Sequence, residues 1–241
     1  MRIREADSTA DLQETALIQR EVWNVEDIEI VGHLQLKAAM HAGGSVLVAE
    51  MEDGAIAGFS YALPAYVAGD VFWHSDMLAV RPAFRGGQVG QKLKWAQRDH
   101  ALRCGIKRIT WTFDPMQAGN AHLNIELLGA TACEYLYDFY GVTTSSLHHG
   151  LPTDRLLANW DLLAPAVQAR ADGPSLPPFE AEQDVAIPSK WNDLVAAGPA
   201  QAIAEQKRVA VALVAAFARG LSIQRFDKSS SSYLLGRPEH P

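Results

Sequence analysis

The stretch from Arg81 to Trp95 reads RPAFRGGQVGQKLKW and places three glycines and two arginines at the start of a helical pattern. Backbone N–H groups at the start of a helix have no intrahelical partner, and the helix dipole adds positive potential there. Glycines let a ligand approach the backbone closely. A turn of this composition suits a bound phosphate, although a plain strand-to-helix turn explains the glycines equally well.

Two ionisable side chains come shortly before this turn, in the strand pattern VFWHSDMLAV. Alternation with a period of two predicts that His74, Asp76, Leu78 and Val80 share one face. An imidazole with an ordinary pKa of about 6.5 accepts a proton near neutrality, and Asp76 can orient it or act through water. Hydrogen-bonded polar residues at the opening of a strand account for the pair equally well, so both interpretations stay open.

Three tyrosines in EYLYDFYG are candidates for a proton donor: Tyr135, Tyr137 and Tyr140. Aromatic residues in a strand usually fill the core, and Tyr140, beside Gly141 at the end of the strand, is the least core-like of the three. Arg155 is expected either to bind a carboxylate or to form an edge-strand salt bridge.

Other reactive residue types carry no clear signal. Cys104 and Cys133 lie in apolar contexts without a paired histidine, which predicts buried packing rather than a nucleophilic role. His148 and His149 have no third ligand at a recognisable spacing, so no metal site is predicted.

Hydrophobic patterning indicates one α/β domain followed by an extension. Residues 45–51 and 55–63 form a predicted hairpin around Glu52-Asp53-Gly54. A βαβ unit follows, made of a strand at 71–80, the glycine turn, a helix at 89–103 and a strand at 106–114. This order predicts that the two strands are parallel. The remaining predicted elements are strands at 3–5, 132–141, 154–162, 184–188, 221–228 and 231–235, and helices beginning after Ser8 and at 31–40, 120–128 and 201–218.

Residues 163–180, rich in Ala, Pro and Gly, are predicted to be a linker. The linker would separate a domain at 1–162 from an extension at 181–241 that packs on the domain or on a partner subunit.

Composition limits the class of protein. The chain has 241 residues, of which 48% are hydrophobic and 20% charged, and a formal net charge of −7. The acidic balance argues against nucleic-acid binding. The N-terminal residues lack the pattern of a signal peptide, and no run reaches the ~18 apolar residues of a membrane span, so a cytoplasmic protein is expected. Two cysteines fit a reducing compartment.

The sequence LAVRPAFRGGQVGQKL resembles motif A of the GNAT superfamily of acyltransferases, a strand ending in Val-x-Pro followed by a glycine-containing turn. Residues 119–130, GNAHLNIELLGA, resemble motif B, a short helix that ends in glycine. The resemblance covers residues 2–162. It departs from the family at Gln88, where the first glycine of Gly-x-Gly is expected, and at Ile125, where many members have a tyrosine that protonates the leaving thiolate.

The resemblance implies a mixed α/β (α+β) GNAT-like sheet flanked by helices, here with a small C-terminal β-α-β-β extension. It also implies that acetyl-CoA or another acyl-CoA is the co-substrate, without a metal. Its pyrophosphate would bind the turn, and the end of the strand would hold the pantetheine arm. The cofactor-binding residues implied are Met77, Leu78, Val80, Arg85, Gly86, Gly87, Gln88, Val89, Gly90, Asn120 and Asn124.

The expected activity is transfer of an acetyl or other short acyl group, succinyl included, to a small-molecule amine such as an amino acid. The reaction needs a base, an oxyanion donor and an acid. His74, Asp76 and Tyr140 are the catalytic candidates, and the N–H near Leu78 is the family-like oxyanion donor. Neither a nucleic-acid nor a membrane partner is expected, and a homodimer is left open. The alternative is a catalytically silent module that binds acyl-CoA, which Gln88 and Ile125 favour.

Overall fold

The computed structural model describes residues 1–141, 143–144, 150–173 and 179–238. The chain divides into two compact units. Unit 1 comprises Met1–Trp111 and Thr143–Leu147, and unit 2 comprises Thr112–Val142 and His148–Pro241. The division falls within one strand, β5 (Arg108–Phe113). Each unit is described below by itself.

In unit 1 the strands follow the order β1-β2-β3-β4-β5. The first four are antiparallel neighbours, and β4 and β5 are parallel, as the βαβ pattern predicts. The elements before β5 are β1 (Arg2–Glu5), α1 (Thr9–Trp23), η1 (Asp27–Glu29), α2 (His33–His41), β2 (Ser45–Glu50), β3 (Ile56–Val67), β4 (Asp70–Val80), η2 (Pro82–Phe84) and α3 (Val89–Arg103).

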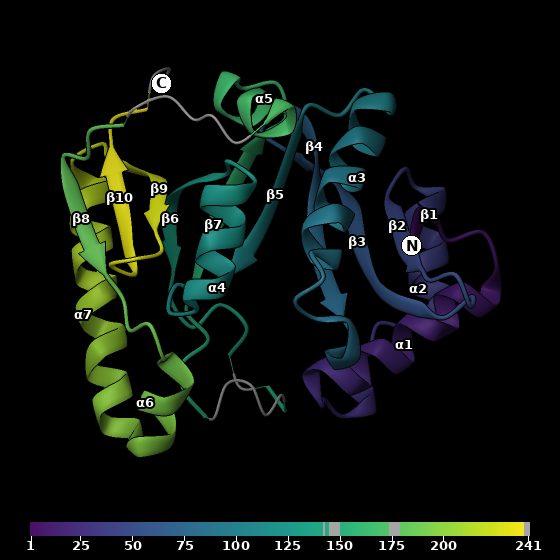
Figure 1. The fold of residues 1–241 in the computed structure, drawn as a ribbon, viewed down its shortest axis with the longest axis horizontal. Helices are drawn as coiled ribbons and strands as arrows, with labels where there is room; N and C mark the ends of the chain where they lie inside the picture. The colour runs from purple at the N-terminus through teal and green to yellow at the C-terminus, as the bar shows by residue number, and fades with distance from the viewer. Residues whose placement is uncertain (142, 145–149, 174–178, 239–241) are drawn as a thin grey trace. The chain divides into compact units, whose positions relative to one another are not determined.

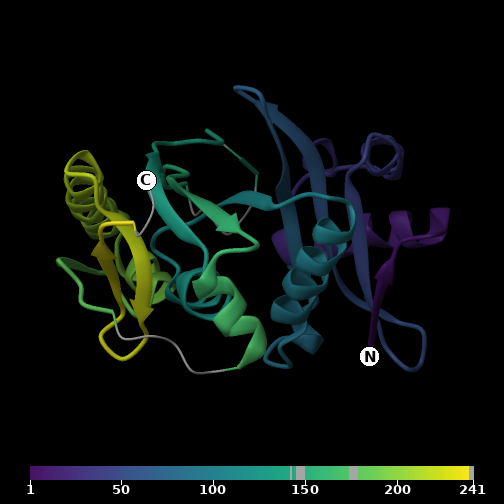
Figure 2. The same ribbon diagram turned by 90° about the horizontal axis from the view of Figure 1, so that it is seen from above.

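Helices cover both faces of this sheet (Figures 1 and 2). On one face, Ile18 of α1 and Leu36 of α2 pack with Phe59 of β3, and all three are fully buried. On the other face, Val89 and Leu93 of α3 pack against the strands. A capping box between Ser8 and Asp11 begins α1, as its sequence predicts.

Strand β4 contains a bulge. Opposite β3, Met77 pairs with Tyr61 and His74 pairs with Leu63, so two residues of β4 oppose a single residue of β3. A bulge of one extra residue interrupts the alternation of faces. Leu78 and Val80 pack on the α3 side, whereas Met77 and Ala79 pack on the α1 side.

The bulge overturns one prediction. Ser75 lies on the α3 side, because its hydroxyl accepts a hydrogen bond from Lys94 of α3. Its neighbour His74 therefore points to the opposite face, whereas Leu78 and Val80 point toward α3. The prediction that His74, Leu78 and Val80 share one face is wrong, because strict alternation does not hold across a bulge.

The side chain of Lys94 is fully buried between α3 and the sheet. Its Nζ donates to Ser75 Oγ at 3.0 Å and to Gln97 Oε1 at 2.9 Å. The same nitrogen lies 3.7 Å from the ring centroid of Trp111. Burial lowers the pKa of Lys94 well below its ordinary value, because desolvation disfavours the ammonium form.

Lys94 is expected to make the stability of the protein depend on pH. Between its lowered pKa and about 10.4, the unfolded chain binds more protons at this residue than the folded chain. The free energy of unfolding should rise with pH over this range, by at most about 1.4 kcal/mol per pH unit. Lys94→Met should remove this part of the slope in urea unfolding at pH 7, 8 and 9.

Lys92→Met is the matched control, because Lys92 is an exposed residue of the same helix. It should retain the slope of the unaltered protein. Equal slopes for the two variants would contradict the expectation for Lys94.

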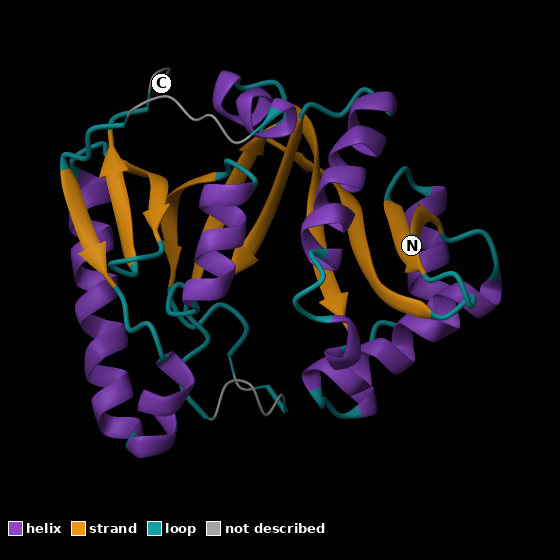
Figure 3. Ribbon diagram, viewed as in Figure 1, coloured by secondary structure: helices purple, strands orange, loops and turns teal. Residues whose placement is uncertain are grey.

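Unit 2 contains the strands β6 (Thr131–Leu136), β7 (Arg155–Asp161), β8 (Gln183–Ala186), β9 (Ser222–Asp227) and β10 (Ser232–Gly236) in the order β7-β6-β9-β10-β8. All pairs described among these strands are antiparallel, including the predicted β9–β10 pair. The helices are α4 (Ala118–Ala121), a π-helical segment η3 (His122–Leu127), α5 (Pro165–Asp172), α6 (Trp191–Ala197) and α7 (Pro199–Ala218), shown in Figure 3.

The C-terminal elements pack on β6 within the same unit. Strand β9 pairs with β6 at Ala132 and Ile223, and the long helix α7 contacts β6 and β8. Arg225 of β9 binds Glu126 of η3, with Nη2 2.7 Å from Oε1. Trp160 of β7 is fully buried and donates to the carbonyl of Leu128.

Two helices differ from the sequence-based expectation. Residues 165–172 of the predicted linker form α5, with Pro165 at its first turn, where a proline needs no hydrogen-bond donor. The short helix α6 has no predicted counterpart. Residues 174–178 of the linker lie outside the described part of the chain, and the domain boundaries drawn at 162 and 181 stay a prediction. None of the described helices has the length and apolar character that crossing a membrane requires.

Candidate active site

The glycine turn leads from β4 into α3 through two residues in the left-handed region. Gly86 has a φ of 82°, and Gln88, the N-cap residue of α3, has a φ of 61°. The first N–H groups of α3, beginning at Val89, have no partner inside the helix. Gly90 lies close to β4, and a Cβ built there would be 3.7 Å from side-chain atoms of Leu78 and Val80. This turn therefore has the form of an anion-binding helix start.

The two arginines of the turn have different surroundings. Arg81 forms ion pairs with Glu14 and Glu21 of α1, and its Nε donates to the carbonyl of Ile56. Arg85 is exposed, and its Nε donates to the carbonyl of Val80 at 3.3 Å. Of the two, Arg85 is the better placed to meet an anion at the turn, because Arg81 is held by carboxylates.

The left-handed conformation of Gln88 explains why the family pattern has glycine here. A side chain in this region costs about 1–2 kcal/mol, and glycine loses about 0.5–1 kcal/mol in backbone entropy. Gln88→Gly is therefore expected to raise the free energy of unfolding by roughly 0.5–1 kcal/mol, measured by urea unfolding. Gln91→Gly, within the helical part of α3, should instead lower it by about 1 kcal/mol. A loss of stability in Gln88→Gly would show that the glutamine side chain supports the turn.

His74 lies on β4 beside the parallel strand β5. Its Nδ1 is 3.0 Å from Thr110 Oγ1. When Nδ1 carries the hydrogen and donates it to Thr110, Nε2 is left to accept a proton. Burial lowers the pKa of His74, Asp76 raises it and Lys94 lowers it. The net shift is downward, so the imidazole stays neutral to a more acidic pH than usual.

Asp76 lies within the bulge of β4, and its side chain is exposed at the surface. Partial desolvation nevertheless raises the pKa of Asp76, and His74 opposes this rise. Burial raises the pKa of Tyr61 on β3, and the charge of Asp76 raises it further. The bulge therefore places a carboxylate within electrostatic range of both His74 and Tyr61.

The predicted tyrosines all belong to unit 2 and differ in environment. Tyr135 is buried, and its hydroxyl donates to Asp154 Oδ2 at 2.7 Å; burial and this carboxylate raise its pKa far above the ordinary value. Tyr140 is 46% exposed, and its hydroxyl lies 2.8 Å from Thr112 Oγ1. Tyr140 is therefore accessible to a ligand, whereas the proton of Tyr135 is held by Asp154.

The motif-B segment of unit 2 forms α4 and η3. Asn120 is exposed, and Asn124 is buried with its carbonyl accepting from Ala130. Ile125 stands where many family members have the tyrosine that protonates the thiolate, and its side chain is fully buried in the core here. A π-helical segment such as η3 is rare and frequently lies at a functional site.

Three minor predictions need correction or qualification. Cys104 and Cys133 are both exposed rather than buried, because one caps the end of α3 and the other lies at an irregularity of β6. Burial of part of Cys133 and the charge of Glu134 raise the pKa of its thiol, which disfavours a thiolate nucleophile. Arg155 is buried on β7, and its Nη1 donates to the carbonyl of Asp154. His148 and His149 lie outside the described residues.

Sequence reasoning missed Asp114, the residue that follows β5. Its Oδ1 accepts from the N–H of Met116, yet burial raises the pKa of its carboxyl, an effect that Arg155 opposes. The Asp-Pro pair after a strand is ordinary turn chemistry, so no sequence signal distinguished this residue.

Comparisons with known proteins agree with this geometry. Residues 8–123 match the model of the acetyltransferase (GNAT) family. The resemblance to this family seen in the sequence is confirmed over these residues. No curated protein matches the chain.

Solved structures show the same fold. The yncA protein from Salmonella typhimurium, solved with its cofactor acetyl-CoA, is 22% identical over 68% of this chain and 95% of its own, with a TM-score of 0.54. A phosphinothricin acetyltransferase of the GNAT superfamily from Sinorhizobium meliloti, in complex with acetyl-CoA, is 20% identical over 66% and 86%, with a TM-score of 0.55. A ribosomal-protein-alanine N-acetyltransferase from Brucella melitensis is 22% identical over 66% and 98%, with a TM-score of 0.51. At these identities the likeness concerns the fold, a mixed sheet flanked by helices with additional C-terminal strands here.

Proposed function

We propose that the chain is an acyl-CoA-dependent N-acyltransferase that transfers an acetyl or other short acyl group, such as succinyl, to the amine of a small molecule. The observation that carries the proposal is the turn between β4 and α3, where left-handed Gly86 and Gln88 lead into the start of α3. Two neighbours of the same fold were solved with acetyl-CoA. An amino acid or an amino-acid derivative is the acceptor class proposed.

In this proposal the turn from Arg85 to Gly90 binds the pyrophosphate, because backbone N–H groups and the positive end of the helix dipole favour an anion there. The backbone of Met77, Leu78 and Val80, beyond the bulge, holds the pantetheine arm. The N–H near Leu78 donates to the developing oxyanion. Asn120 and Asn124 in unit 2 are proposed as further contacts to the co-substrate.

The proton transfers are assigned to side chains. His74 is proposed as the base that keeps the attacking amine neutral, with Asp76 raising its basicity. The amine nitrogen attacks the thioester carbonyl, its proton passes to His74, and the C–S bond breaks with release of the thiolate. Tyr140, whose hydroxyl is exposed beside Thr112, is proposed as the acid that protonates this thiolate.

A second candidate is a catalytically silent module that binds acyl-CoA. Burial of Ile125 at the position of the usual acid favours it. Gln88 does not distinguish the two, because its left-handed conformation keeps the backbone path that the family's glycine provides. A sensor of this kind would bind the thioester and release no thiol.

Isothermal titration with acetyl-CoA and succinyl-CoA, followed by a free-thiol assay over a panel of amino acids, tests the proposal. The acyltransferase predicts binding of at least one thioester and amine-dependent thiol release. Binding with no thiol released for any amine would favour the silent module. No binding of either thioester would contradict both candidates.

A further inference from the structure

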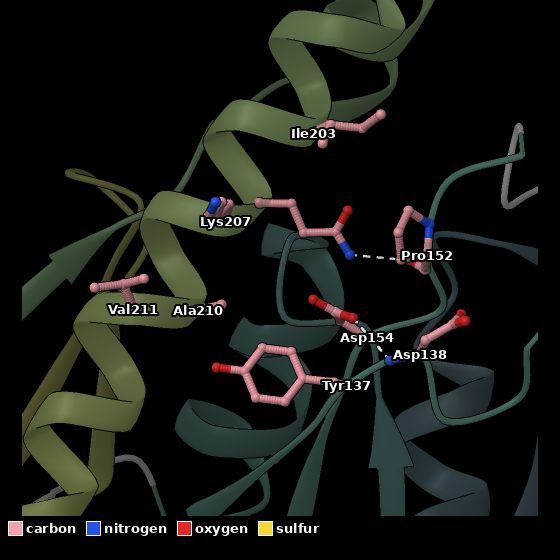
Figure 4. Close-up of a pocket in the computed structure, with 9 residues that line it drawn as sticks. Tyr137, Asp138, Pro152, Asp154, Ile203, Lys207, Ala210 and Val211 are labelled. Carbon is pink, nitrogen blue, oxygen red and sulfur yellow. Dashed lines mark hydrogen bonds between the residues drawn. The ribbon is translucent and has the colours of Figure 1, made fainter.

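Unit 2 contains a cavity of about 350 Å³ between α7 and the segments on either side of the β6–β7 connection (Figure 4). Most of its lining is apolar and comes from one face of α7 together with the ring of Tyr137 and Pro152. The lining residues are Tyr137, Asp138, Pro152, Asp154, Ile203, Gln206, Lys207, Ala210 and Val211. An apolar cavity with a few polar groups is the usual form of a small-molecule site.

Gln206 supplies a buried polar group to this lining. The residue is buried, with 6% of its surface exposed. Its Nε2 donates to the carbonyl of Pro152 at 2.9 Å, which fixes the orientation of the amide. Among the described residues, its Oε1 has no hydrogen-bond partner. A buried acceptor without a donor costs free energy, so a ligand that donates a hydrogen bond here would be favoured.

The carboxylates of the lining already have donors from the protein. Asp154 accepts from the hydroxyl of Tyr135 and from the N–H of Asp138. Asp138 accepts from the N–H of Thr153 at 2.9 Å. Two carboxylates against the single ammonium of Lys207 leave the lining with a formal charge of −1. This charge favours a neutral or cationic N–H donor over an anion.

We propose that this cavity binds a small amine with an apolar body, whose N–H group donates to Gln206 Oε1. Tyr137, Ile203 and Val211, all more than 45% exposed, would be covered by the apolar part of the ligand. This inference does not depend on the transferase proposal, because binding of the amine is measurable without coenzyme A.

The test is isothermal titration of the full chain with phenethylamine, with 3-phenylpropanoate as a probe of similar size and opposite charge. Phenethylamine should bind, and 3-phenylpropanoate should bind at least tenfold more weakly. Ile203→Trp, which fills the cavity from an exposed position, should weaken phenethylamine binding at least tenfold. Ala204→Trp introduces the same ring at the next exposed residue of α7, outside the lining, and should leave binding unchanged.

Gln206→Leu keeps a side chain of similar volume and removes the acceptor, so it should weaken phenethylamine binding by about tenfold. Thermal unfolding of each variant checks that the fold is intact. Equal binding of the two probes, equal binding by Ile203→Trp and Ala204→Trp, or no binding of phenethylamine would overturn the proposal. If only the transferase proposal is wrong, phenethylamine should still bind but no amine should cause thiol release.

Discussion

Replacement of His74 by alanine is expected to lower kcat of acyl transfer by about 100-fold to 10,000-fold, the usual contribution of a general base. The imidazole is held by Thr110 on the neighbouring strand, and burial lowers its pKa. The base must be neutral to act, so the acid limb of the pH–rate profile of the unaltered protein should lie below about pH 6.5. The limb should be lost in the variant, as measured by thiol release between pH 5 and 9.

His100 provides a matched control for this experiment. It is another histidine of unit 1 whose pKa burial lowers, and its ring stacks on Trp73 with a centroid distance of 5.5 Å. His100→Ala should retain kcat within a few-fold and keep the acid limb. A folded His74→Ala protein with undiminished turnover would show that His74 is only a satisfied polar residue of the strand.

The second large effect concerns the anion-binding turn. Gly86→Asp is expected to weaken the binding of acetyl-CoA at least tenfold, equivalent to about 1.4 kcal/mol. Aspartate tolerates the left-handed region better than most residues, so the backbone path should persist. The new carboxylate would repel the pyrophosphate that the turn is proposed to bind. Isothermal titration with acetyl-CoA measures the change.

Gly54→Asp is the matched control. Gly54 lies in the turn between β2 and β3 with a φ of 85°, against 82° for Gly86, and a Cβ at either position would meet nothing within 4 Å. Both variants therefore carry the same charge change and a similar backbone conformation. If the two bind acetyl-CoA equally, the turn before α3 is not the pyrophosphate site.

Local signals predicted much of the fold. The bounds of α3, Val89–Arg103, agree with the sequence-based prediction because the glycine turn precedes the helix and Gly105, with a φ of 79°, follows it. The capping box at Ser8 was predictable because it depends on residues close together in the chain. The parallel pairing of β4 with β5 was predictable because crossover connections follow a handedness rule.

Features that depend on tertiary contacts were not predictable. The bulge of β4 arises from its pairing with β3. The residue types of the segment Ser75-Asp76-Met77 do not indicate a bulge, so the faces of His74 and Leu78 could not be assigned correctly from the sequence. Lys94 reads as a solvated residue of an amphipathic helix, yet Ser75, Gln97 and Trp111 surround it. The role of Gln206 could not be predicted from the sequence either, because only the packing of α7 near Pro152 makes its side chain part of a cavity.

A crystal structure of the protein with coenzyme A would show directly whether the turn before α3 binds the pyrophosphate. We expect the pyrophosphate against the backbone N–H groups between Arg85 and Gly90, and the pantetheine arm along β4 beyond its bulge. A coenzyme A molecule bound elsewhere, with no phosphate at the turn, would contradict the proposed binding site.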